Sequence, residues 1–201
     1  MERYLTYDFA LRKKRRGDIW LDRNIAKENL LLFKKICDSV KLDFIILYGT
    51  LLGAVRENNF IKHDYDTDTA IFGKDIDKLI EAKELLKNSG FELIRTSQSD
   101  NVFSFMRKDE YIDVYVLSPS TQLFKKYYSC DGGRIDFKHL SKLSKINFLG
   151  EEFIAPSNAT DLLIKWFGGD WEIPKKNEEA MQLGIKNYYE RIKRRITQVI
   201  R

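Results

Sequence analysis

Three aspartates at intervals of two residues constrain this chain more than any other feature of its sequence. Asp64, Asp66 and Asp68 are separated from one another by a tyrosine and a threonine. Only an extended strand places every second side chain on one face, about 6.6 Å from the next. Carboxylates at that spacing repel one another unless a cation or water lies among them. Because the residues up to Phe72 include β-branched and aromatic types that suit a pleated surface, the stretch predicts an acidic strand end.

A Gly-Thr pair lies upstream of these acids, just after an apolar run. Residues 42–47 predict a short buried strand, and residues 51–57 a short helix. Gly49 at the junction would let backbone N–H groups approach a phosphate, and Thr50 adds a hydroxyl donor near the helix start. An ordinary strand-to-helix turn would also explain the glycine, but the acids that follow favour a phosphate site. Arg56 is expected either to contact a phosphate or to pair with a structural carboxylate.

A further acid stands alone among β-forming residues in the run Tyr111–Leu117. A charged side chain is rarely left buried unless it is paired or metal-bound. We therefore predict that Asp113 faces the first acids across neighbouring strands. The alternative is an exposed aspartate on an alternating strand.

The rest of the chain shows helical and extended patterns in mixed order, which predicts an α+β fold. Helices are expected over 22–41 with Asp22 as the N-cap, over 74–89, over 156–166 and over 178–200; strands over 91–96, 102–107 and 111–117, with a hairpin over 145–154. Residues 118–143 give no clear pattern, and His139 receives no role.

Length and composition are those of one globular domain of 201 residues. We expect a core over about 22–175, a basic N-terminal segment 1–21 and a C-terminal helix over about 176–201. A net charge of +5 favours anionic partners. The chain has neither a signal-peptide pattern nor a run able to span a bilayer. A cytoplasmic protein is expected, with the basic termini as a candidate peripheral contact at the inner face of the membrane.

Two competing interpretations of the charged residues carry less weight. The basic residues are not interleaved with aromatics as in recognised RNA-binding motifs, so nucleic acid is not the expected partner. Asp64, Asp66, Asp68 and Asp75 fall at positions 1, 3, 5 and 12 of an EF-hand loop. Thr69 stands where that loop requires glycine, which argues against calcium binding of this type. The acids instead suit Mg²⁺ or Mn²⁺ beside a phosphate, as in phosphoryl or nucleotidyl transfer.

The run GTLLGAVR from Gly49 to Arg56, followed by Phe60-Ile61 and by the acids up to Asp68, resembles the signature of the LicD/fukutin family of the nucleotidyltransferase superfamily. Further matches are Ile112–Tyr115, Trp166-Phe167-Gly168, Trp171 and Pro174, so that the resemblance covers about residues 22–175. One departure is that the family's usual Pro-Trp-Asp-Asp-Asp is here Lys62-His63-Asp64-Tyr65-Asp66. This change keeps the metal pair and leaves the choice of donor open.

The resemblance implies a nucleotidyltransferase-like mixed β-sheet flanked by helices, and an enzyme dependent on Mg²⁺ or Mn²⁺. Such an enzyme would transfer a phosphorylated alcohol, such as phosphocholine, from a CDP-activated donor to a sugar hydroxyl. The acceptor would be a surface glycan or its lipid-linked precursor, as in capsule or lipopolysaccharide biosynthesis. The alternatives are a nucleotidyltransferase that releases pyrophosphate and a non-catalytic module that binds a nucleotide or glycan.

The resemblance also assigns roles by position. The catalytic and metal-binding residues would be Asp66, Asp68 and Asp113. The substrate-binding residues would be Gly49, Thr50, Arg56, His63 and Asp64. For His63, contact with a substrate phosphate, proton transfer and simple packing are all open.

Overall fold

The computed structural model describes residues 20–62, 64–97, 101–130 and 133–175. By its internal contacts the chain divides into two units, residues 1–169 and residues 170–201. In the second unit, Lys175 Nζ donates to Asp170 Oδ1 at 2.8 Å. The expected C-terminal helix and nearly all of the expected basic N-terminal segment lie outside the described residues.

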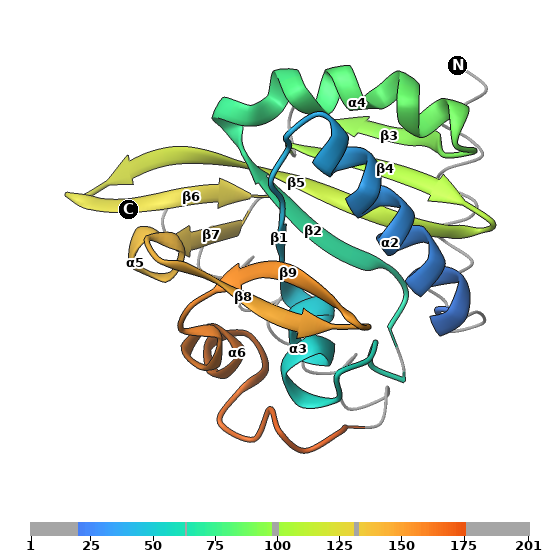
Figure 1. Cartoon of the computed structure of the whole chain (residues 1–201). Helices are drawn as coiled ribbons and strands as arrows, with labels where there is room; N and C mark the ends of the chain where they lie inside the picture. Colours follow the sequence, from blue (N-terminus) through green and yellow to red (C-terminus); the bar gives the residue numbers. More distant parts are fainter. Residues whose placement is uncertain (1–19, 63, 98–100, 131–132, 176–201) are drawn as a thin grey trace, which may run out of the picture. The chain divides into compact units, whose positions relative to one another are not determined.

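The first unit is built on a mixed β-sheet, as the sequence predicts, and its strand order differs strongly from its chain order (Figure 1). Along the sheet the strands are β3 (Glu92–Ser97), β4 (Val102–Arg107), β5 (Glu110–Gln122), β2 (Thr67–Phe72), β1 (Ile45–Ile46), β9 (Glu151–Pro156) and β8 (Leu143–Phe148). Strand β6 (Lys125–Cys130) pairs with the end of β5, and β7 (Gly133–Asp136) pairs with β6. The pairs β2–β5 and β1–β9 are parallel, and the others are antiparallel.

Helices connect these strands and cover the sheet. They are α2 (Arg23–Ser39), α3 (Tyr48–Arg56), α4 (Ile76–Asn88) after a 3₁₀ turn at Gly73–Asp75, α5 (Phe137–Leu140) and α6 (Ala159–Phe167). The predicted N-cap of α2 is confirmed, because Asp22 Oδ1 accepts from Asn24 N at 2.9 Å and from Ile25 N at 3.1 Å. None of the helices in the described part of the chain is long and apolar enough to cross a membrane.

Two clusters of buried side chains hold the sheet in place. Phe33 of α2 packs against Phe44, Phe91 and Phe105, with ring centroids 5.3, 6.4 and 6.1 Å away. The other cluster joins strands β1, β2 and β5 to the later helices: Ile45, Leu47, Ala70, Val102, Tyr115, Leu117, Cys130, Ile135, Leu140 and Leu162. Each valine, leucine, isoleucine or phenylalanine in these clusters contributes roughly 1.5–3 kcal/mol when fully buried. Ala70 and Tyr115 extend the second cluster towards the acids on β2 and β5.

Several sequence-based details need correction. The strand predicted after α2 is only two residues long, and β2 begins at Thr67, so Asp64 and Asp66 precede the strand instead of lying in it. Because Asp68 and Thr69 belong to that strand, the segment is not an EF-hand loop. On α4, the apolar side chain of Ile80 is 57% exposed, although the helical spacing of the apolar residues in 74–89 predicts that it packs in the core. Strands β6 and β7 were not predicted, because residues 118–143 show no clear pattern in the sequence.

Candidate active site

The centre of the candidate site is the parallel pairing of β2 with β5. In that register Asp68 is the direct partner of Asp113. Side chains alternate between the faces of a strand, so Asp113 shares its face with Tyr111 and Tyr115. The predicted meeting of Asp113 with the upstream acids is confirmed, and Asp113 is only 4% exposed.

Asp68 is held by three hydrogen bonds to two other elements, α3 and β5. Its Oδ2 accepts from Gly49 N at 2.9 Å, and its Oδ1 accepts from the Tyr115 hydroxyl at 3.1 Å. Its own backbone N–H donates to Thr50 Oγ1 at 2.8 Å. The Gly-Thr pair at the start of α3 therefore fixes the position of this carboxylate, and in doing so ties α3 to β2.

The other two expected catalytic acids have hydroxyl partners. The Tyr111 hydroxyl donates to Asp66 Oδ2 at 3.0 Å. The Ser104 hydroxyl on β4 donates to Asp113 Oδ1. Ser104 is fully buried, so its hydroxyl orients Asp113 from within the sheet. Asp66, Asp68 and Asp113 are thus each oriented by a neutral hydroxyl donor from a neighbouring strand.

Asp64 is the least satisfied acid. Its Oδ1 accepts from Tyr65 N at 3.1 Å, but its Oδ2 is buried without a hydrogen-bond partner among the described residues. Such an atom loses its hydration without compensation, which is destabilising. The loop that carries it is anchored: Leu21 N donates to Asp64 O at 2.9 Å, and the Trp20 ring stacks on Tyr65 at 5.1 Å.

Gly49 is required by the approach of Asp64. A Cβ on residue 49 would lie 2.5 Å from Asp64 Oδ2, closer than real Cβ contacts. The preceding residue, Tyr48, has a φ of +45°, which is strained for a tyrosine. Its ring packs on Tyr115 and Trp166, with centroids 5.3 and 4.6 Å away. These contacts hold a sharp turn that brings α3 against the acids.

The four aspartates perturb one another electrostatically. Burial raises the pKa of Asp68 well above its ordinary value, and the charges of Asp66, Asp64 and Asp113 raise it further, while the Gly49 N–H opposes them. Burial, with the charge of Asp66, likewise raises the pKa of Asp64. Converging carboxylates that resist ionisation are typical of sites that take up a cation.

The carboxylate oxygens of the four aspartates are ligands of the type that hard divalent cations prefer. Mg²⁺ and Mn²⁺ prefer oxygen ligands and keep several waters, so one or two carboxylates suffice on the protein side. The partnerless Asp64 Oδ2 and the space left by Gly49 agree with such an ion. Among the described residues, however, no three His, Cys, Asp or Glu side chains are already arranged to enclose a metal.

The structure shows other contacts for the remaining residues that are expected to bind substrate. Arg56 pairs with a carboxylate, since its Nη2 lies 2.6 Å from Glu57 Oε1. Thr50 is fully buried, and both Gly49 and Thr50 bond to Asp68 in this structure. Their phosphate-binding role stays a prediction, as does that of Arg56. His63 lies outside the described residues.

Sequence reasoning missed the three hydroxyl donors Tyr111, Tyr115 and Ser104. The two tyrosines counted only as strand-forming residues. Their spacing of two on either side of Asp113 was the available signal, because it puts all three side chains on one face of a strand. Ser104 carried no comparable signal, because its role depends on the register of β4 with β5, which pairs it with Asp113.

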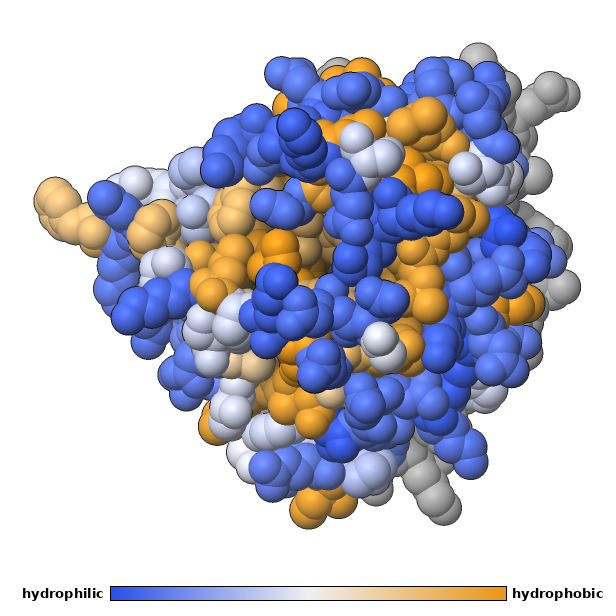
Figure 2. All heavy atoms as spheres, in the orientation of Figure 1, coloured by the Kyte–Doolittle hydropathy of each residue, from blue (hydrophilic) through white to orange (hydrophobic). Residues whose placement is uncertain are grey.

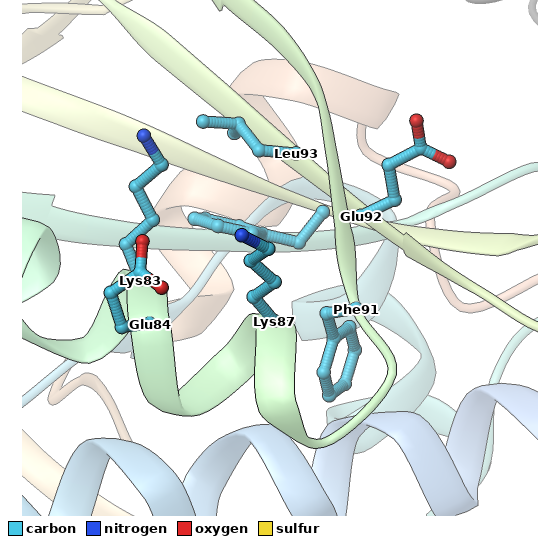
Figure 3. Close-up of a pocket in the computed structure, with 7 residues that line it drawn as sticks. Lys83, Glu84, Lys87, Phe91, Glu92 and Leu93 are labelled. Carbon is cyan, nitrogen blue, oxygen red and sulfur yellow. The ribbon is translucent and has the colours of Figure 1, made fainter.

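A hollow of about 280 Å³ lies elsewhere on the first unit, between α4 and strands β3 and β4 (Figure 3). Figure 3 shows Lys83, Glu84 and Lys87 of α4 at its margin, with Glu92 and Leu93 of β3. It has two lysines and two glutamates and includes none of the four aspartates. Its charges balance, so we assign no catalytic role to it.

Fold and acid cluster together define a nucleotidyltransferase-type domain, and comparisons with known proteins agree. A sequence profile of the LicD/FKTN/FKRP nucleotidyltransferase domain matches residues 41–158, more than half of the chain. This chain therefore belongs to the LicD/FKTN/FKRP family and is a transferase of the nucleotidyltransferase superfamily. No curated protein sequence matches it significantly.

Solved structures support the fold. The lincosamide antibiotic adenylyltransferase LnuA, in its lincomycin-bound crystal structure, is similar with a TM-score of 0.51 at 13% identity, over 77% of this chain and 91% of LnuA. The solution structure of the antibiotic-resistance factor ANT(2'')-Ia is similar with a TM-score of 0.51 at 12% identity, over 88% of this chain and 99% of that one. At such identities the likeness establishes the architecture alone.

Proposed function

We propose that this chain is a metal-dependent transferase that moves a phosphorylated alcohol, of the phosphocholine type, from a CDP-activated donor to a sugar hydroxyl. One observation carries the proposal. Asp64, Asp66, Asp68 and Asp113 converge on one side of the β2–β5 pair, within the segment that matches the family. The acceptor would be a surface glycan or its lipid-linked precursor.

Asp66, Asp68 and Asp113 would hold Mg²⁺ or Mn²⁺. When bound, the ion would supply a Lewis acid that polarises the donor phosphate and offsets charge on the leaving group. Gly49 and Thr50 keep Asp68 in position, and Tyr111 and Tyr115 do the same for the acids they contact. The first turn of α3 offers a positive dipole end near the donor diphosphate.

The reaction would be a displacement at phosphorus. The oxygen of the acceptor hydroxyl bonds to the phosphorus that carries the alcohol, and the bond from that phosphorus to the oxygen of CMP breaks. The hydroxyl proton passes to a carboxylate, for which Asp113 is the first choice and Asp64 the second. The products are a sugar phosphodiester and CMP. The reaction would take place in the cytoplasm, at the inner face of the membrane when the acceptor is lipid-linked.

The nearest alternative is transfer of the whole nucleotide. The same acids could promote attack at the α-phosphorus of a nucleoside triphosphate, with pyrophosphate as the leaving group. This alternative is suggested by LnuA, a protein of similar fold that is an adenylyltransferase. Products distinguish the two: CMP supports transfer of the phosphorylated alcohol, and pyrophosphate supports transfer of the nucleotide.

The test is a thermal-shift panel with CDP-choline, CDP-glycerol, CDP-ribitol, CTP and UTP, each with and without Mg²⁺ or Mn²⁺. A ligand at 100 times its dissociation constant adds about 2.7 kcal/mol, which raises the melting temperature by roughly 5–11 °C for a chain of this size. We expect a metal-dependent shift with one CDP-alcohol that is lost in Asp66→Ala and kept in Asp77→Asn, an exposed acid on α4. A shift unaffected by Asp66→Ala and Asp68→Ala would instead support a non-catalytic binding module.

A further inference from the structure

The most exposed apolar side chains among the described residues lie together at one turn. Leu123 and Phe124 are 85% and 101% exposed, whereas the other exposed large hydrophobic residues range from 37% to 64%. They join β5 to β6, where Gln122 pairs with Lys125, so the turn consists of these two residues alone. In Figure 1 the β5–β6 hairpin extends away from the central strands, and Figure 2 shows a hydrophobic projection at its end.

The backbone of this turn makes the exposure costly. Leu123 and Phe124 have φ of +48° and +64°. A two-residue hairpin turn with both φ values positive favours Asn-Gly, because bulky side chains are strained there. Neither the strain nor the exposure contributes to the stability of the fold. Two large apolar groups are thus displayed where a polar turn would be more stable.

Charge next to the turn is of one sign. Lys125 and Lys126 follow it directly and are exposed, and the run from Ser118 to Cys130 contains no acidic residue. The base of the hairpin, by contrast, is packed: the Tyr128 ring lies 5.3 Å from Phe72 and 5.4 Å from Phe137. The hairpin is therefore anchored at its base and presents an apolar end with cationic flanks.

We propose that this turn docks on an anionic membrane surface, with Leu123 and Phe124 entering the interface and the two lysines contacting anionic headgroups. Apolar side chains that enter a bilayer while adjacent lysines meet the headgroups are the usual combination for peripheral attachment. Charge complementarity favours this partner. A hydrophobic protein groove could bind Leu123 and Phe124, but it would offer no anionic groups to the two lysines, whereas anionic headgroups would. The proposal does not depend on the substrate of the acid cluster.

The experiment is cosedimentation of the full chain with vesicles of phosphatidylcholine alone and with phosphatidylglycerol added. We expect binding only to the anionic vesicles. The double variant Leu123→Asn/Phe124→Gly should bind the anionic vesicles at least about tenfold more weakly than wild type, because the apolar contact is lost. Since Asn-Gly suits the turn, the variant should melt at the same or a higher temperature, which excludes misfolding as the cause. Lys125→Gln and Lys126→Gln should each weaken binding about fivefold.

Ile80→Ser is the matched control, because Ile80 is an exposed apolar residue on α4 with 57% exposure. It should leave vesicle binding unchanged. Full binding by the Asn-Gly variant would overturn the proposal and assign attachment to another part of the chain. A dimer or larger species that dissociates in this variant, measured by light scattering without vesicles, would also overturn it, because the turn would then be a contact between copies.

Discussion

Asp68 and Asp113 are direct partners across the parallel β2–β5 pair. Paired residues on adjacent strands lie about 4.8 Å apart, and their side chains point to the same face of the sheet. Two acids that are distant in sequence therefore lie side by side on one face. The charge of Asp113 is among the causes of the raised pKa of Asp68. The sheet register itself therefore assembles the acid cluster, and a change at either residue should be felt at the other.

Asp68→Asn tests this cluster most directly. The amide keeps the size of the side chain but removes the charge that would bind a divalent ion. We expect transfer activity to fall on the order of 100-fold or more, because several kcal/mol of transition-state stabilisation are lost. The melting temperature of the metal-free protein should not fall, which shows that the fold is intact. Asp77→Asn should keep full activity, and loss of activity there would indicate a nonspecific charge effect.

Tyr115→Phe separates orientation of a carboxylate from binding by it. The substitution removes only the hydroxyl that donates to Asp68 Oδ1. Loss of a partner that orients a metal ligand typically weakens metal binding 10- to 100-fold. We therefore expect a weaker affinity for Mn²⁺, measured by calorimetry, with turnover restored at high metal concentration. Tighter metal binding would contradict this expectation, because it would mean that the hydroxyl competes with the ion for Oδ1.

Gly49→Ala should be destabilising by about 1–3 kcal/mol, the usual cost of overpacking. The added Cβ would lie 2.5 Å from Asp64 Oδ2. Because the conflict is with one side chain, Gly49→Ala/Asp64→Ala should recover most of the lost stability in urea unfolding, which a double-mutant cycle measures as coupling. Gly169→Ala is the matched control, since a Cβ there meets nothing within 4 Å. Additive effects of the two changes would show that the contact is not the cause.

Much of the fold follows from local sequence signals. The cap at Asp22, the helix expected over 74–89 and the hairpin expected over 145–154 each rest on nearby residues, and the structure confirms them. The sequence predicts helix α2 but not every residue of its buried face. Asn29 is buried together with Phe33 and Ile36, because its Nδ2 donates to Arg107 O at 2.7 Å. A polar residue with a distant backbone partner cannot be recognised by hydrophobic periodicity.

The acids of the site were recognisable from their types and spacing, but their partners were not. The bonds of Asp68 to Tyr115 and of Asp113 to Ser104 depend on how β4, β5 and β2 pair. Pairing between distant strands is a property of the assembled sheet, since register is set by burial of whole strand faces. The hairpin of β5 and β6 was missed because its turn has Leu-Phe where Asn-Gly would have signalled a hairpin.

Asp64→Asn should stabilise the metal-free protein. Its Oδ2 is buried without a partner among the described residues, and the charge of Asp66 adds repulsion. The amide removes the buried charge and its repulsion with Asp66, so the free energy of unfolding at neutral pH should rise by roughly 1 kcal/mol or more. Unfolding in urea, with metal removed by a chelator, measures the change. A destabilised variant would show that Asp64 has a compensating partner in solution.

His139 provides a test of pH dependence away from the acids. It is buried, with Nε2 3.8 Å from Asp136 Oδ2. Burial lowers its pKa, as do the charges of Lys165 and Lys138, while Asp136 and Asp161 partly oppose the shift. The native state therefore prefers the neutral imidazole.

The pKa of His139 is lower in the native state than in the unfolded chain, so at intermediate pH the unfolded chain holds a proton that the native protein lacks. Above the ordinary pKa of histidine, the neutral His139 costs the native state nothing. As the pH falls below that pKa, the unfolded chain takes up the proton first, and the free energy of unfolding decreases. Between about pH 7.5 and about pH 5.5, where histidines titrate, wild type should lose more stability than His139→Gln. Urea unfolding across this range measures the difference. An identical slope in His139→Gln and wild type would contradict the assignment.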